Sequence, residues 1–161
     1  MEKITQTKLI VELIWWIFTG VLVILVVYPM LSTFEEYDFI VSNAIFVIVT
    51  VTFTRYIFLL RHTFLASCRI GKAILLFGSI PLIFYLVSQM YYFRDFMDNE
   101  GLQSFNAYFV EGVDYETRQT VLVYMAREMI FTGTASVIVS SLMPFRMLIS
   151  VWRVYNKTGK V

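Results

Sequence analysis

Four long apolar runs, separated by short polar segments, dominate the pattern along the chain. The first run is free of charge from residue 13 to residue 34, the second covers residues 39–60 with Arg55 as its single charge, and the third is free of charge from residue 73 to residue 93. The fourth lies between residues 120 and 151. A helix needs about 20 apolar residues to cross the roughly 30 Å hydrocarbon core of a bilayer. We therefore predict transmembrane helices at about residues 10–31, 39–60, 72–93 and 121–150, with a link at 94–118 before the last.

The composition supports lipid rather than water as the solvent. Hydrophobic residues make up 58% of the 161 residues, charged residues make up 16%, and the mean hydropathy is +0.71, whereas a soluble domain has roughly 25% charged residues. The runs are apolar on every face, and they are too long for membrane-spanning strands, which need only about 10 residues and alternate polar with apolar positions. The sequence thus predicts an all-α integral membrane protein, a four-transmembrane-helix bundle formed by one domain over residues 1–161.

Charges between the runs alternate in sign and predict an orientation. Residues 32–38 hold three acidic residues and no Lys or Arg, while residues 61–72 hold three basic residues and no acid. Residues 94–118 hold six acidic residues against two Arg, and the segment after residue 151 is again basic. Basic segments stay on the cytoplasmic side of a membrane. We therefore expect both termini to be cytoplasmic and the 94–118 link to face outward, in a plasma or inner membrane.

Glu128 is the acid whose position in the fourth run is ambiguous. If the span begins near residue 120, Arg127 and Glu128 both sit well below the outer surface, where Glu128 could bind a proton or a cation. If the span begins near residue 129, both lie at the outer interface, and this placement puts fewer charges in hydrocarbon. We favour the second placement. At the start of the first run, Glu12 follows Lys8 by four residues. We expect these two side chains to form an ion pair at the membrane interface, and we assign the pair no function.

A strip of small and polar residues follows Glu128 along the fourth run. Thr132, Ser136 and Ser140 recur at every fourth position, so they lie one above another on a helix. Small residues allow helices to approach closely, so we interpret the strip as a packing seam; a hydrated pathway that begins at Glu128 is the alternative. Asn43 and Thr50 share a face of the second run, and we expect that face to meet the strip.

Two further groups of residues invite a hypothesis about ligands or partners. Arg55 and Arg146 each lie about two helical turns inside a later Arg, so they either snorkel to the inner interface or bind an anionic lipid headgroup together. In the 94–118 link, Phe105 and Phe109 fall at helical spacing with Leu102, and Tyr108 is among the aromatic residues around them. This set predicts a segment that lies on the outer leaflet or docks on a partner.

Chemical motifs are sparse, and this limits the function classes. There is one His and one Cys, so a bis-histidine haem and an internal disulfide are excluded, and we predict no catalytic, cofactor-binding or metal site. The net charge of +1 with scattered basic residues argues against nucleic acid. We expect the lipid bilayer and other membrane subunits, or further copies of the chain, as partners. The leading hypothesis is a non-catalytic subunit that scaffolds or regulates a membrane complex; the alternatives are an oligomeric channel or transporter and, third, a lipid-modifying enzyme.

Overall fold

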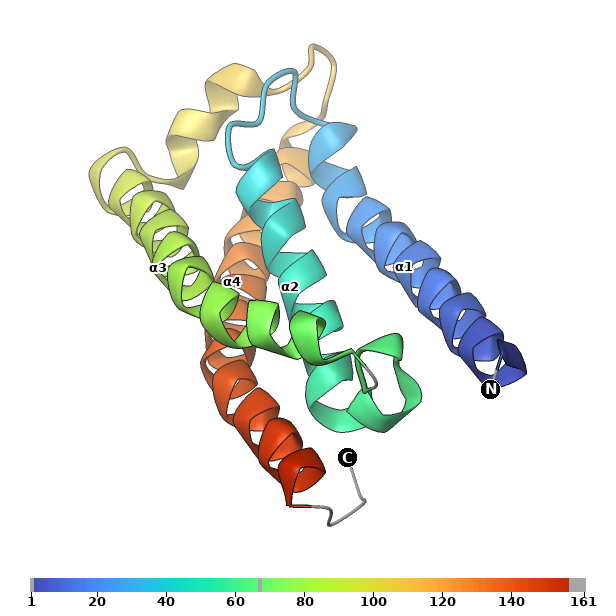
Figure 1. Cartoon of the computed structure of the whole chain (residues 1–161). Helices are drawn as coiled ribbons and strands as arrows, with labels where there is room; N and C mark the ends of the chain where they lie inside the picture. The colour runs from blue at the N-terminus through green and yellow to red at the C-terminus, as the bar shows by residue number, and fades with distance from the viewer. Residues whose placement is uncertain (1, 67, 157–161) are drawn as a thin grey trace.

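Four long α-helices make up most of the computed structural model, which describes residues 2–66 and 68–156 (Figure 1). The long helices are α1 (Glu2–Leu31), α2 (Ile40–Leu59), α3 (Arg69–Asn99) and α4 (Tyr115–Tyr155). Short 3-10 helices lie at η1 (Leu60–His62), η2 (Phe64–Ala66) and η3 (Leu102–Tyr108). Within the described ranges there is no β-strand, only one isolated bridge. The all-α, four-helix prediction is confirmed, and all four helices are long and apolar enough to cross a membrane.

The helices continue beyond the apolar runs from which they were predicted. α3 ends at Asn99 and α4 begins at Tyr115, so the predicted link at 94–118 is shorter than expected. Polar side chains do not end a helix that lies at a surface, and Arg94 and Asp98 form an exposed ion pair four residues apart within the last turns of α3. The link ends at Asp114. Its carboxylate accepts hydrogen bonds from the backbone N–H and the hydroxyl of Thr117 and so caps the start of α4.

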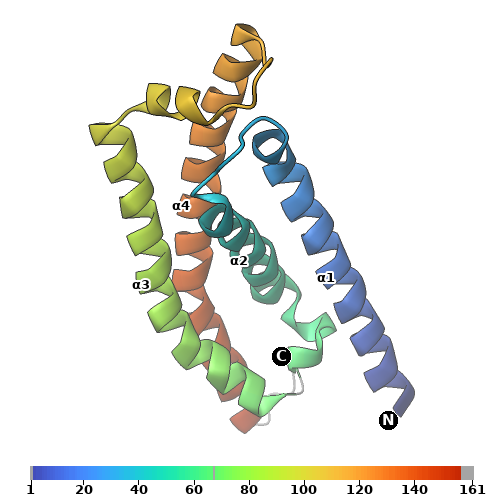
Figure 2. The ribbon, with the colours of Figure 1, turned by 90° about the horizontal axis from the view of Figure 1, so that it is seen from above.

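The long helices lie side by side and share two common ends. The two-link end carries residues 32–39 and 100–114, and the terminal end carries the start of α1, the end of α4 and residues 60–66 (Figure 1). α4 packs against both α2 and α3, while α2 and α3 touch each other little. α1 packs mainly on α2 and stands at the edge of the bundle (Figure 2). α4 is therefore the helix that joins the bundle together.

The buried face of α4 is filled by methionines and small residues. Met125, Met129, Met143 and Met147 are fully buried, as are Ser136 and Ser140. At Gly133, an added Cβ would fall on the sulfur of Met90 in α3 and press on the ring of Phe46 in α2. Unbranched methionine side chains suit irregular gaps, so this face is closely packed where it meets its two neighbours.

An aromatic cap closes the two-link end. Phe34 and Phe109 form an isolated antiparallel bridge, in which the N–H of Glu35 donates to Tyr108 at 2.8 Å and the N–H of Val110 donates to Thr33 at 3.0 Å. The rings of Phe34 and Phe109 stack with centroids 4.4 Å apart, and Phe105 packs against Phe34. The cap ties together two links that are far apart in the sequence.

The aromatic residues of the third link occupy different positions from those expected of a partner surface. Phe105 is 3% exposed and Phe109 is 6% exposed, whereas Tyr108 is 40% exposed. The two phenylalanines point inward because the first link supplies aromatic rings for them to pack on, and helical spacing within the third link alone gives no sign of that. The expected outer surface is therefore limited, among these three residues, to Tyr108.

Candidate functional site

The most unusual polar group in the interior is a set of three side chains near the two-link end, here called the Glu128 cluster: Tyr37, Asn43 and Glu128. Each comes from a different segment, Tyr37 from the first link, Asn43 from the first turn of α2 and Glu128 from α4. Asn43 is fully buried and donates from Nδ2 to Oε2 of Glu128 at 2.6 Å. Its Nδ2 also faces the sulfur of Met30 at 3.4 Å. A buried hydrogen bond therefore joins α2 to α4, and Tyr37 of the first link lies beside it.

Three oxygen atoms of the Glu128 cluster are buried without a hydrogen-bond partner. They are Oη of Tyr37, Oδ1 of Asn43 and Oε1 of Glu128. Burial raises the pKa of Tyr37 far above its usual range, so this hydroxyl keeps its proton. Buried polar atoms are normally paired, and an unpaired one destabilises the fold by about 1–3 kcal/mol. Three of the buried side-chain atoms that no described protein group pairs therefore lie together in this cluster.

Arg127, although adjacent to Glu128, faces the other way. Its side chain is exposed, and it lines an open groove of about 730 Å³ with Tyr124, Phe131 and an edge of Glu128. Among the described residues Glu128 forms no ion pair with Arg127 or any other basic side chain. Glu128 thus lies between the interior cluster and a groove that opens to the surface.

The strip that follows Glu128 is buried between helices. The hydroxyl of Thr132 donates to the carbonyl of Glu128 at 2.9 Å, and that of Ser136 donates to Gly133 at 2.7 Å. Across the contact, the hydroxyl of Thr50 donates to the backbone carbonyl of Thr132 at 3.2 Å. Ser140 is also fully buried, and its hydroxyl has no partner. The structure therefore brings the predicted face of α2 against the strip on α4.

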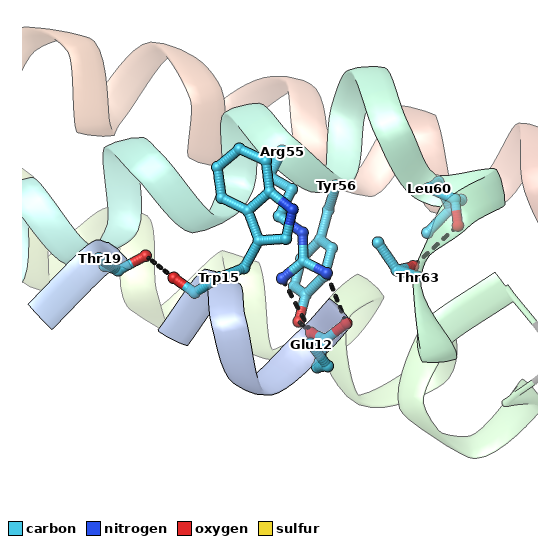
Figure 3. Close-up of polar contacts among 7 residues, drawn as sticks. All are labelled: Glu12, Trp15, Thr19, Arg55, Tyr56, Leu60 and Thr63. Carbon is cyan, nitrogen blue, oxygen red and sulfur yellow. Dashed lines mark hydrogen bonds and ion pairs between the residues drawn. The ribbon is translucent and has the colours of Figure 1, made fainter. Parts of the chain in front are cut away.

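A second polar group, near the terminal end, was not predicted from the sequence. Arg55 of α2 binds Glu12 of α1 through two hydrogen bonds of 2.7 and 3.2 Å, and the hydroxyl of Tyr56 donates to Glu12 at 2.8 Å. Figure 3 shows the guanidinium group of Arg55 directed at the carboxylate between the rings of Trp15 and Tyr56, whose centroids are 5.2 and 5.6 Å from it. The pair fastens α1, which has few other contacts, to α2.

A signal for this pair was present in the sequence. Glu12 precedes the long charge-free part of the first run, and Arg55 is the single charge in the second. Because consecutive helices run antiparallel, a residue near the start of one and a residue near the end of the next reach the same level. Charge sign and depth together point to Arg55 as the partner of Glu12. The structure pairs Glu12 with Arg55 and not, as expected, with Lys8.

The two arginines proposed to bind a lipid headgroup do not share an environment. The guanidinium of Arg55 is occupied by Glu12. Arg146 donates from Nε to the backbone carbonyl of Ile57 at 2.8 Å, which joins α4 to α2, and Lys72 lies within electrostatic reach. A shared headgroup site between Arg55 and Arg146 stays a prediction.

The described residues contain no group of three or more His, Cys, Asp or Glu side chains placed to hold a metal ion. Comparisons with known proteins add no assignment: no family model matches the chain, and no curated protein and no solved structure matches it either. The chain's own residues are therefore the evidence for its function.

Proposed function

We propose that this chain is an integral membrane protein with four transmembrane helices and that it serves as a non-catalytic subunit of a larger membrane complex. Four helices that are long and apolar enough to cross a membrane support a location in lipid. The alternation of acidic and basic segments supports an orientation with both termini and residues 61–72 in the cytoplasm and the two-link end outside. The membrane is a plasma or inner membrane in this proposal.

The observation that carries the subunit proposal is the contrast between a filled interior and an uncovered α1. The strip on α4 is packed closely against α2 and α3, and an added Cβ at Gly133 would force the side chain of Met90 to move and would press on the ring of Phe46. By contrast, α1 exposes large apolar side chains along its length, among them Ile10, Ile17 and Leu25. Dispersion contacts drive the association of helices in lipid, and α1 offers a second protein an apolar face for such contacts.

Photo-crosslinking in native membranes tests this proposal. A photoreactive residue at Ile17, which is 60% exposed, should give an adduct with another membrane protein, and purification in mild detergent should recover that protein at fixed stoichiometry. The same residue at Val27, which is buried on the same helix, is the matched control and should crosslink only within the chain. A lone monodisperse chain whose Ile17 crosslinks only to lipid would contradict the subunit role.

A second candidate function is an oligomeric channel or transporter, with Glu128 at the start of a pathway along Thr132, Ser136 and Ser140. The observation in its favour is the inward carboxyl group with an unpaired oxygen. Reconstitution in liposomes separates the two candidates. The subunit proposal expects no ion flux from this chain alone, whereas the transporter expects a flux that the Glu128→Gln variant abolishes.

A further inference from the structure

A pocket with basic walls lies at the terminal end, where the start of α1 meets the residues that follow α2. It is open, has a volume of about 490 Å³, and is lined by Thr7, Lys8 and Val11 of α1 and by Arg61 and His62 of η1. This volume lies within the range of about 300–1,000 Å³ that is usual for pockets that bind small molecules. Among the described residues that line it, none is acidic. The pocket therefore offers a ligand positive charge from two separate segments.

The ion pair between Glu12 and Arg55 brings these basic residues to one level. It fixes the register of two antiparallel helices, so the residues before Glu12 and the residues after Arg55 both extend toward the terminal end. Lys8 precedes Glu12 by four residues, which is about 6 Å along a helix, and Arg61 follows Arg55 by six residues. The pocket therefore lies one to two helical turns nearer the terminal end than the ion pair.

The chain does not neutralise the positive charge of the pocket. The nearest acid along α1, Glu12, already accepts hydrogen bonds from Arg55 and Tyr56 (Figure 3). Among the described residues, neither Lys8 nor Arg61 forms an ion pair, and the side chain of Arg61 is exposed. Two fixed positive charges therefore face a pocket that is large enough for an anion.

The surroundings of the pocket indicate that the anion is a lipid headgroup. One candidate membrane span begins at Gln6 and the next ends at His62, so the pocket lies where two apolar spans end. On its membrane side, α1 and α2 expose large apolar side chains, among them Ile10 and Phe58, which are 59% and 77% exposed. A phospholipid whose phosphate occupies the pocket keeps its acyl chains on this apolar surface, whereas a free anion gains nothing from it. Basic pockets between the cytoplasmic ends of transmembrane helices are typical headgroup sites.

We propose that Lys8, Arg61 and His62 form a binding site for the phosphate group of an anionic phospholipid in the leaflet at the terminal end. Lys8 supplies a point charge, and the planar guanidinium of Arg61 donates to two oxygens of one phosphate. The ring N–H of His62 is a further donor. Arg55 is 5% exposed and is bound to Glu12, so it is not part of this site. The inference rests on the membrane location in the proposed function and not on the subunit role.

Native mass spectrometry of the full chain in mild detergent measures the binding, with phosphatidylglycerol and phosphatidylcholine of the same acyl chains titrated in parallel. One basic residue near a membrane surface strengthens the binding of anionic lipid about fivefold. Lys8→Gln and Arg61→Gln should therefore each weaken phosphatidylglycerol binding about fivefold and leave phosphatidylcholine binding unchanged. Arg69→Gln is the matched control, because it removes an exposed basic residue at the same end that does not line the pocket. If Arg69→Gln weakens the binding as much as Arg61→Gln does, the attraction comes from diffuse surface charge and the proposal is wrong.

Thermal unfolding in the same detergent gives a second readout. A ligand that binds the folded state raises the unfolding midpoint, so phosphatidylglycerol should raise that of the wild-type protein more than phosphatidylcholine does. The double variant Lys8→Gln with Arg61→Gln should lose this excess and keep the midpoint of the lipid-free protein, because substitutions at a surface change stability little. An equal rise in both proteins would contradict the proposal. A rise with inorganic phosphate but not with phosphatidylglycerol would show that the pocket takes a free anion instead.

A separate experiment tests the membrane location on which the site rests. Alkaline carbonate should leave the chain in native membranes, and its release would overturn the location itself. A chain that stays in the membrane and shows no preference for phosphatidylglycerol would contradict the headgroup site alone.

Discussion

Removing one charge of the Glu12–Arg55 pair should be among the most destabilising single changes in this chain. The side chains of Arg55 and Glu12 are 5% and 16% exposed. Glu12→Gln keeps the size of the side chain but leaves the guanidinium of Arg55 without a counter-charge inside the bundle. Arg55→Met has the converse effect on the carboxylate of Glu12, to which only the hydroxyl of Tyr56 would then donate.

The expected magnitude follows from the burial of the two groups. Breaking a buried ion pair by removing one partner destabilises a protein by about 3–5 kcal/mol, because the other charge stays buried. Since Glu12 keeps some contact with solvent, we expect each single variant to lie near the lower end of that range. Replacing both groups by apolar residues, as in Glu12→Leu with Arg55→Met, is often neutral or stabilising by about 1–4 kcal/mol. The double variant should therefore be more stable than either single variant.

The free energy of unfolding in mixed micelles, followed by far-UV circular dichroism as the denaturing detergent is increased, measures these effects. Asp98→Asn is the matched control, because its ion pair with Arg94 is exposed, with side chains 69% and 81% accessible. Such a pair stabilises by less than about 1 kcal/mol. If Glu12→Gln destabilises no more than Asp98→Asn does, the inner pair is effectively solvated. A double variant that is less stable than both single variants would likewise refute the reasoning.

Three further predictions concern the seam, the cap of α4 and the orientation. Ser136→Leu should destabilise the bundle by about 1–3 kcal/mol through overpacking, and Ser136→Ala by much less, in the same detergent titration. Hydrogen bonds from Thr117 hold the pKa of Asp114 below its usual value. The stability that Asp114 gives to the start of α4 is therefore present at neutral pH and is lost as the pH falls through the lowered pKa. Amide exchange at the start of α4 should rise in acid, and Asp114→Asn should remove this pH dependence. In intact cells, a cysteine at Glu36 should react with an impermeant thiol reagent and one at Asn156 should not, and the reverse pattern would overturn the orientation.

The helices were predictable from the sequence because each apolar run exceeds the length needed to cross a bilayer, and composition alone carries that information. The end of α3 and the start of α4 could not be predicted in this way. An exposed helix tolerates charged residues such as Arg94 and Asp98 and continues past the apolar run. Hydropathy marks where lipid contact ends, whereas hydrogen-bonded caps such as Asp114 mark where the helix ends.

The candidate site was predictable only in part, for a related reason. The four-residue spacing from Glu128 to Ser140 placed the strip on one face, and the seven-residue spacing from Asn43 to Thr50 gave the facing residues. The role of Tyr37 and the inward position of Phe105 depend on how two links fold over the same end of the bundle. Contacts between distant links leave no periodic pattern in either segment, so spacing alone could not reveal them.

The central position of α4 has a consequence for biosynthesis. α2 and α3 touch each other little, and each packs mainly on α4, which is the last of the four helices to leave the ribosome. α1 and α2 are able to pair early, since Glu12 and Arg55 are both present once α2 has been made. α3 is then made before its main partner, and the first link stays uncovered until Phe105 and Phe109 have been made. A chain whose synthesis stops before α4 therefore exposes an unpaired helix and an uncovered aromatic link, the two features by which quality control could distinguish it from the finished protein.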